Sequence, residues 1–325
     1  MEQSANKAAP ILYVVVPCYN EEAVLPLTAE RLRTKLEGLV AQGAIANKSR
    51  VLFSDDGSTD GTWSLIRALY EEQGPDGMFL GISLAHNSGH QSALFAGLME
   101  ALACGCDVSV SMDADLQDDP DAIDLMLQEH ANGADIVFGV RQSRDKDTRF
   151  KRGSAHAFYS VMNALGAEVV PDSADFRLMD RRALEALSGY EESNLFLRGI
   201  VGSMGFRTAK VYYRRDERAA GESKYPLRKM VGFALDGITS FSIVPLRMVA
   251  GAGCLFVLVS LAALVYVLVS AITGSAVSGW ASLLISIWFV GGAVMVSMGV
   301  VGEYVGKIYL EAKHRPRYIV AEKLL

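Results

Sequence analysis

Cysteine is scarce in this chain of 325 residues, which has only Cys18, Cys104, Cys106 and Cys254. A scaffold held together by disulfides needs far more cysteine for its length, so that class is excluded. Cys104 and Cys106 form one C-x-C pair with no second pair elsewhere, which argues against a structural zinc site. The low cysteine content fits a reducing compartment.

Two common nucleotide-binding patterns are also missing. No G-x-G-x-x-G follows the first apolar run, which argues against a dinucleotide-dependent dehydrogenase. No G-x-x-x-x-G-K-[ST] occurs, which argues against a P-loop NTPase. The first residues, MEQSANKAAP, lack the long apolar run of a secretory signal.

Positive charge is sparse in the first part of the chain. The net charge is −6 overall, yet residues 198–245 carry nine Lys and Arg against four Asp and Glu. The acidic first part argues against a nucleic-acid partner. A basic stretch just before an apolar region suits contact with anionic lipid or phosphate.

Two long runs have no charge at all, residues 249–272 and residues 280–302. Each is long enough to cross a hydrocarbon core of about 30 Å as a helix. They predict a transmembrane hairpin, and the alternative is a buried helical hairpin of a soluble protein. The loop between the runs is uncharged, so the positive-inside rule places both termini and the large first part in the cytoplasm, as a multi-pass protein of the cell (inner) membrane. The flanking basic residues are Arg228, Lys229, Arg247, Lys307, Lys313, Arg315 and Arg317.

Before these runs, short β-branched segments alternate with longer helical ones. The predicted strands cover residues 11–17, 51–56, 79–84, 108–113 and 135–140, and the predicted helices 22–42, 63–72, 91–103 and 120–132. This alternation predicts an α/β fold with a mostly parallel sheet and helices on both faces. Ligands of such sheets bind at the carboxyl ends of the strands.

Polar clusters follow three of the predicted strands. They are Tyr19-Asn20-Glu21, Asp55-Asp56-Gly57-Ser58 and Asp113-Ala114-Asp115. Because the carboxyl ends of parallel strands share one edge, we expect all three clusters on one rim.

The third cluster has the pattern of a metal site. Asp113 and Asp115, two residues apart just past a strand, can point toward one hard cation, Mg²⁺ or Mn²⁺, with diphosphate oxygens completing its shell. A solvated turn is the alternative. In the second cluster, Asp55 or Asp56 can accept hydrogen bonds from a uracil ring or ribose, while Asp60 can cap the next helix.

Four segments, VVPCYNEE, SDDGSTDGT, MDADLQDDP and GESKYPLRKM, together resemble the inverting family-2 glycosyltransferases with a GT-A fold. The chain is most similar to the membrane branch of that family, which loads a sugar onto a polyprenyl phosphate and includes bactoprenol glucosyltransferases and dolichol-phosphate mannose synthases. The resemblance runs from about residue 11 to 318 and implies a nucleotide-sugar donor, a polyprenyl-phosphate acceptor, the membrane as a partner and a divalent metal.

The resemblance also implies roles for single residues. The nucleotide pocket is expected to be lined by Pro17, Tyr19, Asn20, Glu21 and Asp56. Asp113 is expected at the ribose or sugar side of the donor and near the metal, which Asp115 holds with Gln117. Arg141, at the end of the fifth predicted strand, matches an arginine that faces the donor phosphates.

The segment DSADFRLMDRR matches the part of the family that carries a proposed catalytic aspartate. Asp175 is the predicted catalytic residue of this segment, and Asp172 and Asp180 are weaker candidates. Asp115, in the third polar cluster, is the second residue predicted to be catalytic. A sugar-hydroxyl acceptor would need a general base, whereas a phosphate acceptor is mostly anionic near neutral pH. We therefore expect Asp175 either to remove a proton or to orient the acceptor or the sugar.

A basic segment, residues 214–230, follows this part. Arg215, Arg218 and Lys224 can bind the acceptor phosphate and offset charge on the leaving diphosphate; binding to anionic lipid is the alternative, and it is equally open for Arg228 and Lys229. The next residues predict an interfacial helix leading to the first apolar run.

Two histidines flank Asn87-Ser88-Gly89. His86 and His90 can form a metal pair, but their place between a strand and a helix favours loop and cap roles. Members of the family that the chain resembles usually carry an arginine at the position of His86, so one expected contact to the donor phosphates is weakened here.

The predicted organisation has five parts: a tail (1–10), a cytoplasmic GT-A catalytic domain (11–224), an interfacial segment (225–245), two transmembrane helices (246–303) and a cytoplasmic C-terminal tail (304–325). Glycines at 299, 302 and 306 suit close helix packing. With the resemblance, they favour a homo-oligomer, a tetramer being one option. Ordinary membrane-helix glycine content is the alternative.

The predicted reaction is inverting transfer of a sugar from a UDP-sugar to undecaprenyl or another polyprenyl phosphate, with glucose or N-acetylglucosamine favoured and a separate flippase moving the product. A GDP-mannose enzyme is an alternative, and a non-catalytic membrane scaffold with a retained nucleotide-sugar pocket is another. A processive polysaccharide synthase is disfavoured because no Q-x-x-R-W motif occurs.

Overall fold

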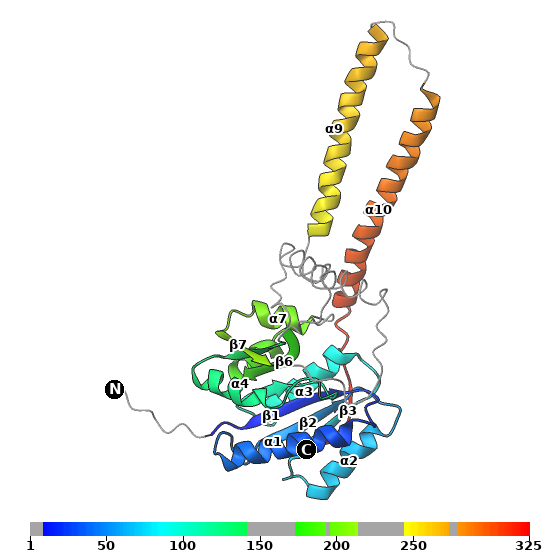
Figure 1. Cartoon of the computed structure of the whole chain (residues 1–325). Coiled ribbons are helices and arrows are strands. Elements are labelled where there is room, and N and C mark those ends of the chain that lie inside the picture. Colours follow the sequence, from blue (N-terminus) through cyan, green and yellow to red (C-terminus); the bar gives the residue numbers. More distant parts are fainter. Residues whose placement is uncertain (1–8, 142–172, 193–195, 214–243, 273–278) are drawn as a thin grey trace, which may run out of the picture. The chain divides into compact units, whose positions relative to one another are not determined.

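The computed structural model describes residues 9–141, 173–192, 196–213, 244–272 and 279–325. They fall into two compact units, drawn in Figure 1. The first unit holds a sheet with its helices and includes residues 316–325, and the second holds two long helices. The predicted interfacial segment, residues 225–245, lies almost wholly outside the described residues.

The first unit begins with strands and helices in alternation, as the sequence predicts. They are β1 (Leu12–Cys18), α1 (Leu25–Ala41), β2 (Arg50–Asp55), α2 (Thr62–Gln73), β3 (Phe79–Leu84), α3 (His90–Ala103), β4 (Val108–Ser111), α4 (Ala122–Ala131) and β5 (Ile136–Arg141). Further elements complete the unit: β6 (Ser173–Asp180), α6 (Arg181–Ser188), α7 (Leu197–Ser203), β7 (Thr208–Tyr213) and β8 (Val320–Leu324).

The strands of the described residues form one sheet in the order β7-β5-β6-β4-β1-β2-β3-β8. Strands β4, β1, β2 and β3 run parallel to one another, and β5 runs parallel to β7. Strand β6 is antiparallel to both β4 and β5, and β8 is antiparallel to β3. The predicted α/β class with a mostly parallel sheet is confirmed.

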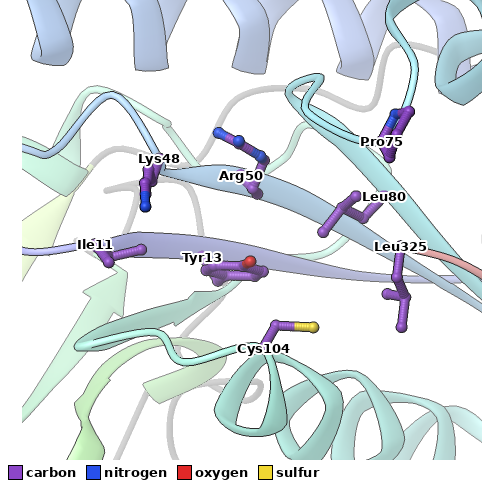
Figure 2. A pocket seen from close by; sticks show the side chains of 8 residues that line it. All are labelled: Ile11, Tyr13, Lys48, Arg50, Pro75, Leu80, Cys104 and Leu325. Atoms are coloured by element: carbon purple, nitrogen blue, oxygen red, sulfur yellow. The ribbon is translucent and has the colours of Figure 1, made fainter.

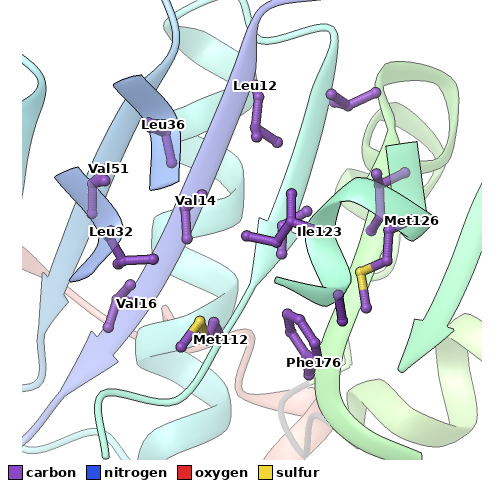
Figure 3. Packing of buried hydrophobic residues seen from close by; sticks show 14 of the residues in the cluster. Leu12, Val14, Val16, Leu32, Leu36, Val51, Met112, Ile123, Met126 and Phe176 are labelled. Carbon is purple, nitrogen blue, oxygen red and sulfur yellow. The ribbon is translucent and has the colours of Figure 1, made fainter. Parts of the chain in front are cut away.

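One face of the sheet carries the apolar core. Leu12, Val14 and Val16 alternate along β1 and point toward this face, where α1 supplies Leu32 and Leu36. Figure 3 shows these side chains together with those of α4 and β6. A strand buried on both faces reads as a continuous apolar run, which is why the sequence locates β1 clearly.

The other face is packed against α3 and is more polar. Gly97 of α3 lies so close to β1 that a Cβ atom there would stand 2.5 Å from a methyl group of Val15. Ser54 of β2 donates to the carbonyl of Ala93 over 2.6 Å. Because side chains alternate along a strand, Asp175 of β6 points to this α3 face while its neighbour Phe176 points to the apolar core.

The second unit contains α9 (Val244–Ile272) and α10 (Trp280–Ala312). Phe256 and Phe289 meet edge to face, with ring centroids 5.3 Å apart. Within the described residues, one helical stretch is long and apolar enough to cross a membrane, Phe289–Ala312, and Leu246–Phe256 is a shorter apolar stretch. Both uncharged runs are helices as predicted, while the transmembrane hairpin and its orientation stay predictions.

The end of the chain differs from the predicted tail. Helix α10 continues to Ala312, and residues 320–324 form β8 at the edge of the sheet beside β3. Glu322 of β8 accepts hydrogen bonds from Trp63 Nε1 over 3.1 Å and from Arg67 over 2.7 Å. The five residues VAEKL are too short and too charged to stand out as a strand, and only pairing with β3 gives them that structure.

Candidate active site

The carboxyl ends of β1, β2 and β4 bring the three polar clusters to one rim. Cys18, the last residue of β1, is paired in register with Asp55 of β2, and Val15 is paired with Ser111 of β4. The shared rim that the sequence predicts is therefore present.

The first cluster is tied to the second by its backbone. Asn20 has a left-handed φ of 54°, which asparagine tolerates better than most residues. Its Oδ1 accepts from the backbone N–H of Thr59 over 2.9 Å, and its own N–H donates to Ser58 Oγ over 2.9 Å. Tyr19 is 45% exposed, whereas Pro17 is buried inside β1. Of the residues predicted to line the nucleotide pocket, Tyr19 and Asn20 are exposed, and Glu21 is partly exposed.

Asp56 binds the loop before α3. Its two carboxylate oxygens accept the backbone N–H groups of Ser88 and Gly89 over 2.7 and 2.9 Å. Burial raises the pKa of Asp56, although both N–H groups act in the opposite direction. Gly57 is required beside it, because φ is +67° and a Cβ atom would stand 2.8 Å from the backbone of His86. The predicted nucleotide contact of Asp56 would have to share these oxygens.

The loop after β4, residues 113–120, carries the predicted metal ligands and has a strained backbone. Leu116 adopts a φ of 55°, a left-handed conformation that is costly for a branched side chain. It lies between Asp115 and Gln117, and the N–H of Gln117 donates to Asp115 Oδ1 over 3.1 Å. The hydroxyl of Thr28, fully buried on α1, donates to the carbonyl of Ala114 over 2.7 Å. This hydrogen bond attaches the loop to α1.

The donor set of this loop suits a divalent metal. Among the described residues no group of three or more His, Cys, Asp or Glu could hold an ion, but Asp113, Asp115 and the carbonyl of Gln117 provide three oxygen donors. Mg²⁺ is usually bound by one or two carboxylates plus substrate phosphates rather than by an all-protein cage. Asp113 Oδ1 is buried and has no hydrogen-bond partner among the described residues, and burial raises the pKa of Asp113 to about 6. A cation would satisfy that oxygen.

Asp175 is the most heavily bonded carboxylate of the site. Its side chain is 5% exposed, and Oδ1 accepts a hydrogen bond from Arg177 Nη2 over 2.5 Å. Arg198, on α7, binds it at two points, with Nε 3.2 Å from Oδ1 and Nη2 3.0 Å from Oδ2. Gln91 Nε2 donates to Oδ2 over 3.3 Å. Burial alone would raise the pKa of Asp175, but the hydrogen bond from His90 and the charges of Arg198 and Arg177 hold it well below its usual range.

His90 connects the carboxylate of Asp175 to the loop after β4. It is the first residue of α3, and its Nε2 lies 3.5 Å from Asp175 Oδ2 and 3.6 Å from Asp113 Oδ1. Burial alone would lower the pKa of His90, but the hydrogen bond with Asp175 and the charge of Asp113 raise it. The cap role predicted for His90 is wrong, because the N-cap of α3 is Gly89 and no side chain caps that end of the helix. The contacts of His90 with Asp175 and Asp113 were not predicted.

Other predicted residues lie elsewhere or are already paired. Asp180, a weaker catalytic candidate, caps α6 by accepting the N–H of Ala183 over 2.8 Å. Arg141, expected at the donor phosphates, is paired with Asp118 and Tyr213. Outside the described residues are Asp172, Arg215, Arg218, Lys224, Arg228 and Lys229.

Arg177 and Arg198 were not predicted from the sequence. Arg177 had one available signal, because it stands two residues from Asp175 on a strand and so shares its face. Arg198 is 23 residues from Asp175 in sequence, and nothing in the pattern FLRG links the two.

A separate cavity of about 190 Å³ opens at the amino ends of the strands. Figure 2 shows that Tyr13, Arg50, Cys104 and Leu325 are among its lining residues. It contains none of the predicted site residues, and the Arg50 guanidinium donates to three backbone carbonyls. The cavity is therefore distinct from the carboxylate-lined rim.

A mostly parallel sheet with aspartates gathered at its carboxyl rim, and two of them in a D-x-D loop, is the arrangement of a glycosyltransferase with the GT-A fold. Comparison with known sequences gives the family. A profile described as "Glycosyl transferase family 2" matches residues 13–188, more than half of the chain. The chain therefore belongs to glycosyl transferase family 2.

Whole-chain relatives extend the match beyond the catalytic unit. The uncharacterized glycosyltransferase YkoT of Bacillus subtilis (strain 168) is 47% identical over 316 residues, covering 97% of this chain and 92% of that protein. The bactoprenol glucosyl transferase of Shigella phage SfV is 37% identical over 309 residues, covering 94% and 97%. A solved structure, glucosyl-3-phosphoglycerate synthase from Mycobacterium tuberculosis, has a TM-score of 0.47 at 19% identity, covering 72% of this chain and 78% of that one.

Proposed function

We propose that the enzyme transfers a hexose from a UDP-sugar to a polyprenyl phosphate at the cytoplasmic face of the membrane, with inversion at the anomeric carbon. The acceptor class is supported by relatives named bactoprenol glucosyl transferase that cover 94–95% of the chain at 37% identity. Such coverage includes both long helices and not only the catalytic unit.

The bonding of Asp175 is the observation that carries this proposal. A carboxylate held by two arginines and a histidine is a weak base, because protonating it would break charge-assisted hydrogen bonds. A sugar hydroxyl would need a base, whereas a phosphate monoester, with a second pKa of about 6, is already a nucleophile near neutral pH. Asp175 then orients groups around the acceptor phosphate and removes no proton.

Charge compensation at the donor comes from the loop after β4. Asp115, Gln117 and Asp113 would hold the divalent metal, which when bound screens the charge of the departing nucleoside diphosphate. His90 keeps Asp113 and Asp175 at a fixed separation, and the loop binds the donor so that its anomeric carbon faces the acceptor. Holding both reactants in line supplies much of the acceleration.

The membrane components complete the proposal. Helix α10 provides a stretch long and apolar enough to span a bilayer, and a lipid phosphate would lie at the surface of that bilayer. Arg215, Arg218 and Lys224 remain the proposed contacts to the acceptor phosphate, with Arg198 added from the structure. Glucose or N-acetylglucosamine is favoured as the sugar, and relatives named bactoprenol glucosyl transferase support glucose; GDP-mannose is the alternative donor.

Turnover by the detergent-purified protein tests the proposal. Short-chain polyprenyl phosphate is offered with Mg²⁺ or Mn²⁺ and a panel of labelled UDP- and GDP-sugars. We expect metal-dependent label in the lipid phase from one donor. Asp115→Ala should abolish it, and Glu185→Ala, which removes an exposed carboxylate paired with Arg181, should leave it intact.

Other outcomes would contradict parts of the proposal. Donor hydrolysis without lipid labelling would show that the acceptor class is wrong. UDP binding without turnover of any donor would favour a non-catalytic scaffold with a retained nucleotide-sugar pocket.

A further inference from the structure

Asp118 is a charged side chain with 0% exposed surface, and it directly follows Gln117 in the loop after β4. None of the roles proposed above uses it. A buried carboxylate is costly unless it is paired and hydrogen-bonded. Its partners therefore indicate what the fold keeps it for.

Those partners form a closed triangle. Asp118 Oδ1 accepts a hydrogen bond from Arg141 Nη2 over 3.1 Å and another from the Tyr213 hydroxyl. Arg141 Nε in turn donates to the Tyr213 oxygen over 3.1 Å. A phenol can donate once and accept at the same time, so all three bonds are compatible. Burial and the charge of Asp118 raise the pKa of Tyr213, which keeps its hydroxyl protonated.

The triangle joins three separate parts of the chain. Arg141 is the last residue of β5 and Tyr213 is the last residue of β7, and the two are register partners on parallel strands. The ring of Tyr213 also meets Phe176 edge to face at 5.1 Å, and Phe176 adjoins Asp175. The loop after β4 is thus fastened to the ends of two strands and lies next to the strand of Asp175.

The strained backbone of the loop explains why the loop needs these hydrogen bonds. A left-handed non-glycine residue such as Leu116 persists only where the surrounding structure holds it. Thr28 holds the loop on one side of Leu116, through the carbonyl of Ala114. The triangle holds it on the other side, through Asp118. Asp115 and Gln117 lie between these two anchors.

We infer that Tyr213 and Arg141 are positioning residues for the metal site, acting through Asp118 to fix the directions of Asp115 and Gln117. This inference rests on the proposed function for the presence of the metal, and it goes beyond it by assigning both residues to the loop. Groups that orient metal ligands from outside the coordination shell typically contribute about 10- to 100-fold in metal affinity or activity.

The test is Tyr213→Phe in the full-length, detergent-purified enzyme. This change removes the hydroxyl and keeps the ring that packs on Phe176. We expect calorimetry in the presence of UDP to give Mn²⁺ binding weakened about 10-fold. In turnover, the Mn²⁺ concentration for half-activation should rise by a similar factor, while kcat at saturating Mn²⁺ changes by less than about twofold.

Tyr212→Phe is the matched control. Tyr212 is the neighbouring residue of β7, and its side chain is 58% exposed on the opposite face of the strand. We expect its Mn²⁺ affinity and half-activation to equal those of the wild type. If Tyr213→Phe does not fold, Arg141→Lys replaces it, because lysine keeps the charge but not the two-point geometry, and weaker Mn²⁺ binding is again expected.

The outcomes separate this inference from the proposed function. Unchanged Mn²⁺ affinity in a folded Tyr213→Phe protein overturns the inference, whatever happens to thermal stability. A wild-type protein that binds UDP but no Mn²⁺ overturns both the inference and the proposed metal. Weakened Mn²⁺ binding in the variant, without lipid labelling by the wild type from any donor, supports the inference and contradicts only the proposed transfer to a polyprenyl phosphate.

Discussion

Arg198 and Asp175 form a two-point ion pair, with Nε 3.2 Å from Oδ1 and Nη2 3.0 Å from Oδ2. The arginine side chain is 40% exposed and the carboxylate 5% exposed. A buried acid therefore fixes the direction of an arginine that reaches the surface of the site. This relationship supports the proposed orienting role of Asp175.

Asp175→Asn should lower both stability and activity. The substitution leaves the fully buried Arg177 without its counter-charge, and breaking a buried ion pair from one side costs about 3–5 kcal/mol. We expect a loss of that size in the free energy of unfolding by urea at pH 7. Asp180→Asn is the control, because asparagine caps a helix about as well as aspartate.

The same variant distinguishes an orienting acid from a general base. If Asp175→Asn unfolds like the wild type but loses the acid limb of the pH–rate profile, Asp175 is a base and the orienting role is wrong. Arg198→Ala should raise the KM for polyprenyl phosphate and cause only a small loss in the free energy of unfolding.

The pKa of His90 should lie above its ordinary value of 6.5 in the metal-free protein. Because the folded value is raised, the charged imidazole contributes stability at pH below 6.5, and this contribution is lost as pH rises through the folded pKa. NMR titration of the histidine ring protons measures it. In Asp175→Asn the hydrogen-bonding partner loses its charge, so the pKa of His90 should fall. A wild-type pKa at or below 6.5 would contradict the contact with Asp175.

Thr28→Val should weaken metal binding with little change in shape. Valine matches threonine in volume but cannot donate to the Ala114 carbonyl, and a buried acceptor left unsatisfied costs about 1–3 kcal/mol. We expect a stability loss in that range, together with weaker Mn²⁺ binding by calorimetry. Thr34→Val is the control on the same helix, since the exposed Thr34 hydroxyl donates only to Glu30 of its own helix. Equal effects of the two substitutions would rule out a specific role for Thr28.

Glu322→Ala should loosen β8 from the sheet. The Glu322 carboxylate accepts hydrogen bonds from Trp63 and Arg67 of α2. Because the Glu322 side chain is 37% exposed, we expect their loss to lower the free energy of unfolding by about 1 kcal/mol. The emission of Trp63, measured in a background with Trp280 and Trp288 replaced by Phe, should shift to the red as its indole N–H becomes hydrated. Lys323→Ala, which removes an exposed pair with Glu100, should leave the emission unchanged. An unshifted spectrum in Glu322→Ala would show that Glu322 does not hold Trp63.

Some strands of the sheet could be located from the sequence, and others could not. The strands β1 to β5 are buried, β-branched and separated by helical patterns, so local sequence locates them. Strand β6 carries Asp175 and Arg177 on one face and apolar residues on the other. Its polar side pairs with residues brought there by the fold, so the segment was matched to the family by its motif, and its strand was not predicted from the sequence pattern.

Among the site residues, Asp113 and Asp115 could be named in advance because the spacing of carboxylates after a strand is a local property, whereas Asp175 was named through the family resemblance of its segment. The contacts that decide their chemistry are not local. Arg198 is 23 residues from Asp175, Tyr213 is 95 residues from Asp118, and Thr28 is 86 residues from Ala114. Hydrogen bonds over such separations depend on the order and direction of the strands.

By itself the sequence determined the fold class, the rim of aspartates and the two uncharged helices, because hydrophobic periodicity and strand-end polarity are set by neighbouring residues. Only the tertiary structure decided that Asp175 is held by arginines, that Arg141 is joined to Asp118 and Tyr213, and that the last residues complete the sheet. Those features arise where elements from distant parts of the chain pack together, and burial there makes each charge depend on the partner that the fold provides.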